Sequence, residues 1–358
     1  MKTWLKVVAI VLLFYAVLSS FYHPLAPGGL SIDIDKLTPG ENTFEFTGYN
    51  THFTNSDLQV YMRSGENTFF CGTILEVKDK SHVKVSLALP DTLPSNDLVF
   101  YANNSEDGTV LVLKSLDLNA FVFQEGYKPM SSCKIQVVTE EHQHFGYPFQ
   151  IILYETIRNL MWHVPMWFTM FVLMFISFGQ SLRTLNALGR EREDNLDTPI
   201  DFAKVALHDL KASTSAHVGL LFCILGLVTG SIWAKFTWLS WWVDDPQLNG
   251  AMVVFLMYVS YFILRNSVND LEKRARLAAI FNIFAFVLLV VLLMVMPRFA
   301  DSLHPGKSGN PAFSSYDLDS SLRMVFYPAV LGFILLGYWM YSSLLRVKKL
   351  EQKYDEHL

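Results

Sequence analysis

The stretch Ser231–Gly250, SIWAKFTWLSWWVDDPQLNG, connects two apolar runs of helix length. Membrane proteins usually place a short polar turn in such a position, but this connector carries four tryptophans: Trp233, Trp238, Trp241 and Trp242. Tryptophan is common at membrane interfaces, because its ring tolerates the headgroup region while its N–H stays hydrated. An interfacial belt, however, distributes its tryptophans over several helix ends. The concentration in one connector favours an aromatic surface for a flat apolar ligand, and the interfacial belt stays the alternative.

Apolar runs recur along the whole chain. Of its 358 residues, 51% are hydrophobic and 14% are aromatic, which is more than one globular core requires. The runs predict six membrane-spanning helices, near residues 4–21, 164–181, 216–233, 249–264, 277–296 and 325–345. At about 1.5 Å per residue each run crosses a hydrocarbon core of roughly 30 Å, although the fourth is short. The sequence therefore predicts an α-helical polytopic membrane protein.

The distribution of lysine and arginine predicts the orientation of these helices. With the N-terminus inside, fifteen Lys and Arg residues lie in the inner segments 1–6, 181–213, 265–276 and 346–358. The short outer connectors 233–250 and 297–324 hold four. Because inner loops carry the excess of positive charge, we predict cytoplasmic termini and an outward-facing tryptophan connector.

The first span has two interpretations. Met1–Ser20 has a basic start, an apolar middle and small residues at Ser19 and Ser20, which is typical of a signal peptide. It lacks an A-x-A cleavage site, so we predict a retained anchor and keep cleavage as the alternative.

Residues 22–150 have a different pattern. Short runs such as ENTFEFTGY, HVKVSLAL and TVLVLKSL are mostly alternating and rich in β-branched or aromatic residues, and turn clusters such as RSGEN and NNSEDG separate them. This pattern predicts an extracytoplasmic all-β, sandwich-like domain inserted after the first helix. The predicted organisation is a first membrane helix at 1–21, the β-rich domain at 22–150, a five-helix membrane domain at 151–348 and a cytoplasmic tail at 349–358.

The inserted domain carries two cysteines and a histidine pair whose roles stay open. Cys71 and Cys133 form a disulfide or remain two buried thiols, because sequence does not place their Cα atoms within bridging distance. His142 and His144 would share one face of a strand. Without a third ligand nearby, a solvated loop is favoured over a metal site.

Two histidines are predicted at the same membrane face as the tryptophans. His163 stands in NLMWHVPMWF at the outer end of the second span, and His304 stands in SLHPG between the fifth and sixth spans. Two imidazoles from separate elements can supply both axial nitrogens to a haem iron, and indole rings can cover the macrocycle. Each histidine alone is more often an interfacial hydrogen-bonding residue. Their joint position makes haem binding an equal alternative.

Other classes of function find little support. A formal charge of −5 without a basic run interleaved with aromatics argues against nucleic acid as a partner. The GKS in HPGKSGN is not a Walker A motif, because Asp301 stands where its first glycine is needed. The sequence also contains no G-x-S-x-G, H-E-x-x-H or Rossmann glycine pattern. A solute transporter with a sensing domain is disfavoured, because no predicted span carries a central charged residue.

These motifs together resemble CcmC, a haem-handling membrane protein family of cytochrome c maturation, in a superfamily that also includes CcsA. The matching parts are MWHVPMW, the tryptophan-rich WWD signature GSIWAKFTWLSWWVDDPQL, and SLHP, in the family's order over roughly residues 150–350. The resemblance implies a haem-binding set. Its members are His163 and His304 as axial ligands of the iron, with Trp233, Trp238, Trp241, Trp242 and Asp245.

The chain departs from the family pattern at three positions. Asp244 stands where the common W-x-W-D signature has its second tryptophan. Gln247 stands where a basic residue is frequent, and Ala234 stands where glycine is usual. These differences bear on contacts with the haem edge.

Asp245 has two interpretations. It immediately precedes Pro246, a preferred first helical residue, so it can cap the fourth span. It can also accept hydrogen bonds while haem is transferred. On the second interpretation, an Asp245→Asn variant is expected to retain haem and pass it on poorly.

The resemblance implies a non-enzymatic subunit that binds haem b at the outer face of the bacterial inner membrane. It would pass the haem to a periplasmic chaperone similar to CcmE, with CcmA and CcmB as ATP-driven partners and lipid around the helices. Both termini would be cytoplasmic, with the β domain and the haem site periplasmic. A CcsA-type cytochrome c synthetase, which attaches haem to C-x-x-C-H thiols, is the enzymatic alternative.

Overall fold

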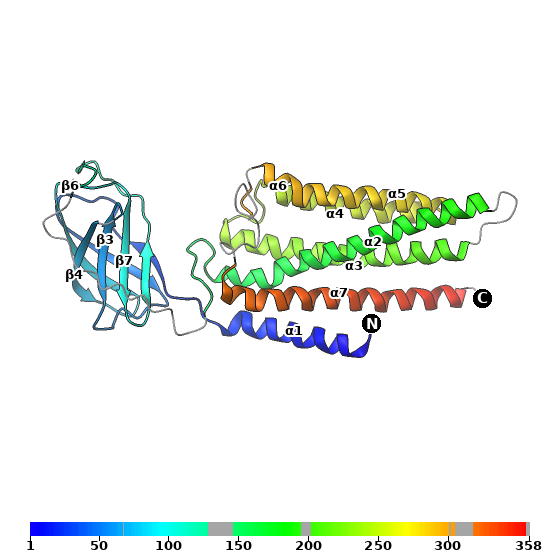
Figure 1. Cartoon of the computed structure of the whole chain (residues 1–358), viewed down its shortest axis with the longest axis horizontal. Helices are drawn as coiled ribbons and strands as arrows, with labels where there is room; N and C mark the ends of the chain where they lie inside the picture. The colour runs from blue at the N-terminus through cyan, green and yellow to red at the C-terminus, as the bar shows by residue number, and fades with distance from the viewer. Residues whose placement is uncertain (67, 128–145, 195–201, 301, 305–317, 356–358) are drawn as a thin grey trace. The chain divides into compact units, whose positions relative to one another are not determined.

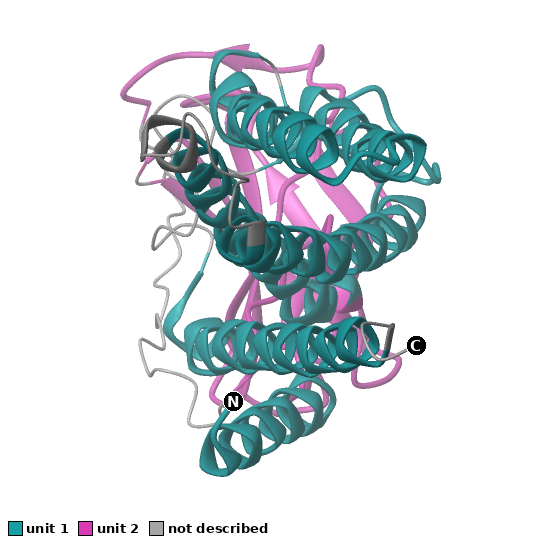
Figure 2. Cartoon of the chain, turned by 90° about the vertical axis from the view of Figure 1, so that its right-hand side faces the viewer, with its two compact units in different colours: residues 1–22, 156–358 teal, residues 23–155 magenta. Residues whose placement is uncertain are grey.

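The structure, a computed structural model, describes residues 1–66, 68–127, 146–194, 202–300, 302–304 and 318–355. The chain divides into two compact units (Figure 2). The helical unit comprises Met1–Tyr22 and Thr156–Leu358, and the β unit comprises His23–Glu155. The predictions for Cys133, His142 and His144 concern residues outside the described part of the chain.

Among the described residues of the helical unit, six helices are long and apolar enough to cross a membrane (Figure 1). They are α1 (Thr3–Tyr22), α2 (Leu160–Asp194), α3 (Phe202–Thr237), α4 (Pro246–Ser267), α5 (Leu271–Val290) and α7 (Ser320–Asp355). A 3-10 helix, η1 (Tyr154–Asn159), precedes α2, and a π-helical turn, η2 (Val291–Val295), joins α5 to the short α6 (Met296–Phe299). The predicted α-helical polytopic fold is confirmed.

Three helices are much longer than the predicted spans. α2, α3 and α7 contain 35, 36 and 36 residues, or about 50 Å each, against a hydrocarbon core of roughly 30 Å. Their additional turns contain charged residues, which end an apolar run but are good helix formers, as in RVKKLEQKYD of α7. Residues 349–355, predicted as the start of the tail, therefore belong to α7.

Helices α2 and α3 approach closely where α3 carries glycine. A Cβ atom at Gly226 would lie 2.8 Å from the Trp167 ring, and one at Gly230 would lie 2.6 Å from the His163 ring. Glycines four residues apart lie on one helix face and allow two membrane helices to pack closely. The side chain of His163 therefore lies directly against the α3 backbone.

Buried polar side chains also connect the helices. Asn282 of α5 donates to Ser177 Oγ at 2.7 Å and to Ser181 Oγ at 2.8 Å, both in α2. Ser177 Oγ in turn donates to the Ala212 carbonyl of α3 at 2.7 Å. Hydrogen bonds of this kind associate helices in an apolar surrounding, where water does not compete for the polar groups.

A buried ion pair joins α3 to α4. The Arg265 guanidinium donates to both carboxylate oxygens of Asp209, at 2.6 and 2.7 Å. The two side chains are 12% and 11% exposed, and the guanidinium lies 5.7 Å from the Tyr261 ring centroid. The planar guanidinium and the carboxylate match each other with two parallel bonds, which fixes their relative orientation.

In the described part of the β unit, seven strands form an antiparallel sheet in the order β1-β2-β5-β4-β3-β7-β8. They are β1 (Gly28–Ile32), β2 (Gly40–Tyr49), β3 (Gln59–Ser64), β4 (Thr68–Val77), β5 (His82–Leu89), β7 (Leu98–Asn104) and β8 (Gly108–Val112). The short strands β6 (Thr92–Leu93) and β9 (Val122–Phe123) form a separate parallel pair. The alternating sequence runs thus form strands, because alternate side chains of a strand point to one face.

The sheet curls until its end strands β1 and β8 lie close together. A Cβ atom at Gly29 of β1 would overlap the Leu111 carbonyl oxygen of β8, so glycine permits this approach. Irregular register in β1 and β4 also bends these strands. The predicted domain is all-β, but the described residues enclose their core in one nearly closed sheet, where a sandwich stacks two sheets.

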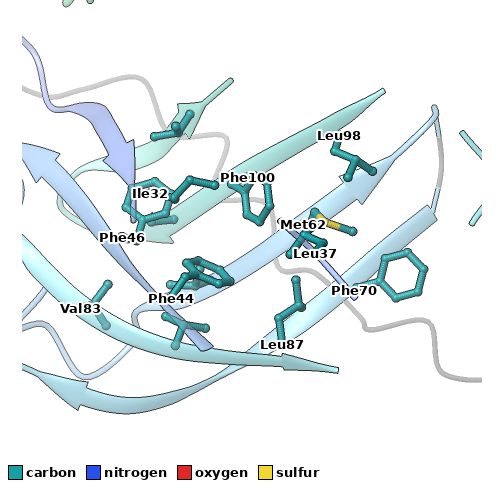
Figure 3. Close-up of a cluster of buried hydrophobic side chains, with 14 of the residues drawn as sticks. Ile32, Leu37, Phe44, Phe46, Met62, Phe70, Val83, Leu87, Leu98 and Phe100 are labelled. Carbon is teal, nitrogen blue, oxygen red and sulfur yellow. The ribbon is translucent and has the colours of Figure 1, made fainter. Parts of the chain in front are cut away.

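The core of the β unit lies inside the curled sheet. Phe44, Phe46 and Phe100 are at most 2% exposed and belong to one hydrophobic cluster (Figure 3). Phe44 and Phe100 pack edge to face, with ring centroids 5.3 Å apart. Cys71, in β4, forms a disulfide, whereas Cys223 of α3 is a free, buried thiol.

Candidate functional site

The tryptophan connector begins as a continuation of α3. Trp238 N–H donates to the Ala234 carbonyl at 2.8 Å, one residue beyond the end of the helix. The chain then turns at Leu239, whose φ of +61° is uncommon for a residue other than glycine. Leu239 and Trp241 are 81% and 58% exposed, although both are apolar. The turn therefore holds large apolar side chains at the surface of the helical unit.

The four tryptophans have different surroundings. The Trp233 ring lies edge-on to His163 with centroids 5.7 Å apart, and the Trp238 ring lies edge-on to His304, also at 5.7 Å. Trp233 Nε1 donates to Thr156 Oγ1 at 3.1 Å. Two tryptophans of the predicted set therefore contact one predicted ligand each.

Trp242 takes part in a polar cluster at the start of α4. Its Nε1 donates to Asn249 Oδ1 at 3.2 Å, and Asn249 Nδ2 donates to Asp244 Oδ1 at 2.7 Å. Asp244, which departs from the family pattern, thus helps to position the ring of Trp242 through Asn249. The described contacts do not join Trp242 or the exposed Trp241 to either histidine.

His163 lies on α2 and is held from α3. Its Nδ1 lies 3.1 Å from Thr229 Oγ1, and the Thr229 hydroxyl donates to the Leu225 carbonyl at 2.8 Å. We assign the hydroxyl hydrogen to the short bond with Leu225; the oxygen then accepts from His163, and this assignment places the imidazole proton on Nδ1. The lone pair of the neutral ring is then on Nε2, the nitrogen available to a metal ion.

His304 is held by Asp245. Its Nδ1 lies 3.2 Å from Asp245 Oδ1, within ion-pair distance but outside the alignment of a regular hydrogen bond. An ionised carboxylate only accepts, so here too the proton belongs on Nδ1 and the lone pair on Nε2. In both rings the nitrogen with the lone pair is thus Nε2. Nδ1 faces Thr229 in His163 and Asp245 in His304.

Asp245 has two structural roles. Its Oδ1 accepts from the N–H groups of Gln247 at 2.9 Å and Leu248 at 3.2 Å, which caps α4. Its Oδ2 accepts from Ser302 Oγ at 2.9 Å and from the Leu303 N–H at 2.8 Å, which ties the segment before His304 to the helix start.

The environment of Asp245 keeps its carboxyl ionised. Burial opposes ionisation, but the contacts with His304 and with the Leu303 N–H outweigh it and lower the pKa of Asp245. The structure also changes one expectation. An amide at this position still caps α4 but offers no second acceptor to Ser302 and Leu303, so Asp245→Asn is now expected to weaken haem retention as well.

The two predicted haem ligands lie in the same unit of the structure. His163 and His304 are close enough for electrostatic interaction with each other. Within the described ranges, no group of three or more His, Cys, Asp or Glu side chains has the arrangement of a metal site. Two imidazoles suit a haem iron instead, because the macrocycle supplies the other four nitrogens.

Sequence reasoning missed the residues behind the two rings. Thr229 stands in GLVTGSIW, directly before the glycine that receives His163, and a hydroxyl beside glycine in an apolar span was the available signal. Ser302 and Leu303 had no comparable signal, because their partner Asp245 is 57 and 58 residues away in the sequence.

A Gly230→Ala substitution tests how His163 is seated. The new Cβ would lie 2.6 Å from His163 Cε1, so the ring must move, and we expect weaker haem binding. The matched control is Gly179→Ala in α2, where a Cβ meets nothing within 4 Å and alanine gains up to about 1 kcal/mol of helix propensity. Haem titration and melting of the two detergent-purified variants check this, and equal haem affinities would contradict it.

Comparisons with known proteins relate part of this chain to one protein family. The family described as CcmC, heme exporter protein C, matches residues 201–357, which include the tryptophan connector and His304 but not His163. A heme exporter protein C of Bradyrhizobium diazoefficiens is 26% identical over 199 residues, 55% of this chain and 68% of that protein.

Two further relatives have the same name. The protein of Paracoccus denitrificans is 28% identical over 127 residues, 36% of this chain and 52% of its own length. That of Escherichia coli K12 is 26% identical over 147 residues, 41% of this chain and 57% of its own length. The chain thus spans about half to two thirds of the length of these relatives. Residues 201–357 of its helical unit are thus similar to the CcmC family.

Proposed function

We propose that this chain is a haem-handling subunit of cytochrome c biogenesis that holds haem b at the outer membrane face and delivers it to a periplasmic haem chaperone. The observation that carries the proposal is the pair His163 and His304, whose Nδ1 atoms face Thr229 and Asp245. This arrangement leaves two Nε2 lone pairs for the axial positions of an iron. The names of the relatives, heme exporter protein C, describe haem handling for those proteins.

The tryptophans support the same proposal. Trp233 and Trp238 each lie beside one histidine, and Trp241 is 58% exposed at the same connector. Aromatic rings favour contact with the flat apolar face of a macrocycle. A connector that places two aromatic rings beside two imidazoles and a third ring in an exposed position suits both the capture of haem and its transfer to another protein.

The resemblance suggests the partners and the location. We propose a CcmE-like chaperone as the haem acceptor and CcmA- and CcmB-like subunits as the ATP-driven partners. We place the chain in the bacterial inner membrane with both termini cytoplasmic and the β unit periplasmic, because lysine and arginine favour the inner segments. Cysteine labelling in intact cells at Lys2→Cys and Ser105→Cys tests this orientation, which predicts labelling of Ser105→Cys only.

The main alternative is a CcsA-type synthetase. Both functions need bound haem, but the synthetase also joins haem to cysteine thiols of an apocytochrome. The absorbance spectrum of the detergent-purified full chain therefore tests haem binding first, and a Soret band of a bis-histidine haem is expected. Transfer to a purified haem chaperone supports the proposed function, whereas covalent attachment to a C-x-x-C-H apocytochrome without the chaperone supports the synthetase.

The tryptophan surface gives a second prediction. A variant with Trp238, Trp241 and Trp242 all replaced by alanine should no longer load the chaperone, and Trp241→Ala alone should load it more slowly. Stacking contacts contribute about 0.5–1.5 kcal/mol per aromatic pair, so the three losses add to a large effect. Trp4→Ala in α1 is the control, because Trp4 is 60% exposed but lies at the predicted inner end. Normal loading by the triple variant would show that another surface transfers haem.

A further inference from the structure

We propose that the two axial histidines are unequal, with His304 the stronger ligand and His163 the one that haem releases first. The cause is the difference between the groups behind the two rings, a carboxylate for His304 and a hydroxyl for His163. This inference rests on the proposed function, because it requires that both Nε2 atoms bind one iron.

The group behind His163 is neutral. Thr229 Oγ1 lies 3.1 Å from Nδ1 and donates its own hydrogen to Leu225 O at 2.8 Å. The Thr229 carbonyl accepts from Asn159 Nδ2 at 3.1 Å, which links this turn of α3 to η1, directly before α2. The hydroxyl therefore orients the ring well but adds no charge to it.

The group behind His304 is charged and fixed in place. Asp245 has a side chain only 1% exposed, and its oxygens accept from two N–H groups of α4 and from Ser302 and Leu303. Little rearrangement is needed for the Nδ1–H of His304 to donate to this carboxylate. In a surrounding of low dielectric constant the charged interaction is stronger than it would be in water.

A carboxylate behind a histidine strengthens its bond to a metal. Donation from Nδ1–H to a carboxylate makes Nε2 more basic, and losing such a partner typically costs roughly 10–100-fold in metal affinity. Haem release then begins at the weaker bond. The iron–Nε2 bond of His163 breaks, its electron pair stays on the imidazole nitrogen, and five-coordinate haem remains on His304 with one axial position open to an incoming ligand.

Single substitutions measure the inequality directly. His163→Ala and His304→Ala are purified as full chains, titrated with haemin and followed by absorbance. We expect His163→Ala to keep a five-coordinate, high-spin haem that added imidazole converts to six-coordinate. His304→Ala should bind haemin roughly 10–100-fold more weakly than His163→Ala. Equal affinities, or the reverse order, overturn the inequality and leave the proposed function standing. Haemin binding by both single variants and by the double variant at the level of the unchanged chain overturns the proposed function itself.

A second comparison tests whether the Asp245 carboxylate causes the difference in haemin affinity between the two histidine variants. In an Asp245→Asn background the two histidine substitutions should differ by less than about threefold. In a Ser302→Ala background, which removes one loop contact of Asp245 and the acceptor of the His304 N–H but keeps the carboxylate, the 10–100-fold difference should persist. An unchanged difference in the Asp245→Asn background overturns the assignment, and the melting temperature of each haem-free variant shows that the variants fold.

Substitutions of Thr229 test the corresponding contact with His163. Thr229→Val keeps the shape and removes the acceptor, so imidazole should displace His163 at a lower concentration than in the unchanged chain. Thr229→Ser keeps the acceptor and should restore the original concentration. Equal imidazole midpoints for the valine and serine variants would show that the hydroxyl does not act on His163.

Discussion

The variant in which both His163 and His304 are replaced by alanine should bind haem at least 100-fold more weakly and show no bis-histidine spectrum. Each ring contributes one Nε2 lone pair, because Nδ1 faces Thr229 in one case and Asp245 in the other. Removing both leaves only aromatic contacts to the macrocycle. A hundredfold loss corresponds to about 2.7 kcal/mol, and titration of the detergent-purified protein with haemin measures it.

The controls for this prediction are histidines of the same chain with other partners. His208 contacts Gln180 Oε1 at 2.8 Å, and His82 of the β unit forms an exposed pair with Asp79. His208→Ala and His82→Ala should leave the haem spectrum unchanged. A bis-histidine spectrum in the double variant, or its loss in either control, would place the iron ligands elsewhere.

Asp209→Asn should be strongly destabilising. Arg265 is always charged and its side chain is only 12% exposed, so the substitution leaves a buried cation without its partner. Removing one partner of a buried ion pair costs about 3–5 kcal/mol. A large fall in the melting temperature of the haem-free protein in detergent is the expected result.

Two further variants test whether the loss of the buried ion pair causes the destabilisation by Asp209→Asn. Glu272→Gln breaks the more exposed pair with Arg276, in which both side chains are about a third exposed, and should cost less than about 1 kcal/mol. Replacing Asp209 by leucine and Arg265 by methionine together removes both charges and should recover most of the lost stability. If Asp209→Asn costs no more than Glu272→Gln, the buried pair does not hold α3 to α4.

The six helices could be predicted because each apolar run reports directly on transfer into a membrane. The lengths of the helices could not be predicted from these runs. The charged end of α7 continues as helix, because lysine, glutamate and glutamine favour helix where hydropathy no longer indicates a span. The alternating runs likewise predicted strands, but the curl of the sheet depends on contacts such as Gly29 against Leu111, 82 residues apart in the chain.

The candidate site could likewise be predicted only in part from the sequence. The residue types of His163, His304 and the four tryptophans, together with their predicted membrane face, were enough to suggest haem as the ligand. The cap formed by Asp245 also followed from the proline after it, because capping is a local interaction. These inferences depend only on chemistry and on near neighbours in the sequence.

Tertiary structure alone decided what stands behind each ring. Thr229 reaches His163 from another helix, and Asp245 reaches Ser302, Leu303 and His304 across 57 to 59 residues of chain. No periodicity encodes such pairs, because they depend on how two helices pack and where a loop returns. The sequence suggested which groups would bind an iron, and the packing placed Thr229 and Asp245 beside Nδ1 of the two histidines, which assigns the lone pairs to Nε2.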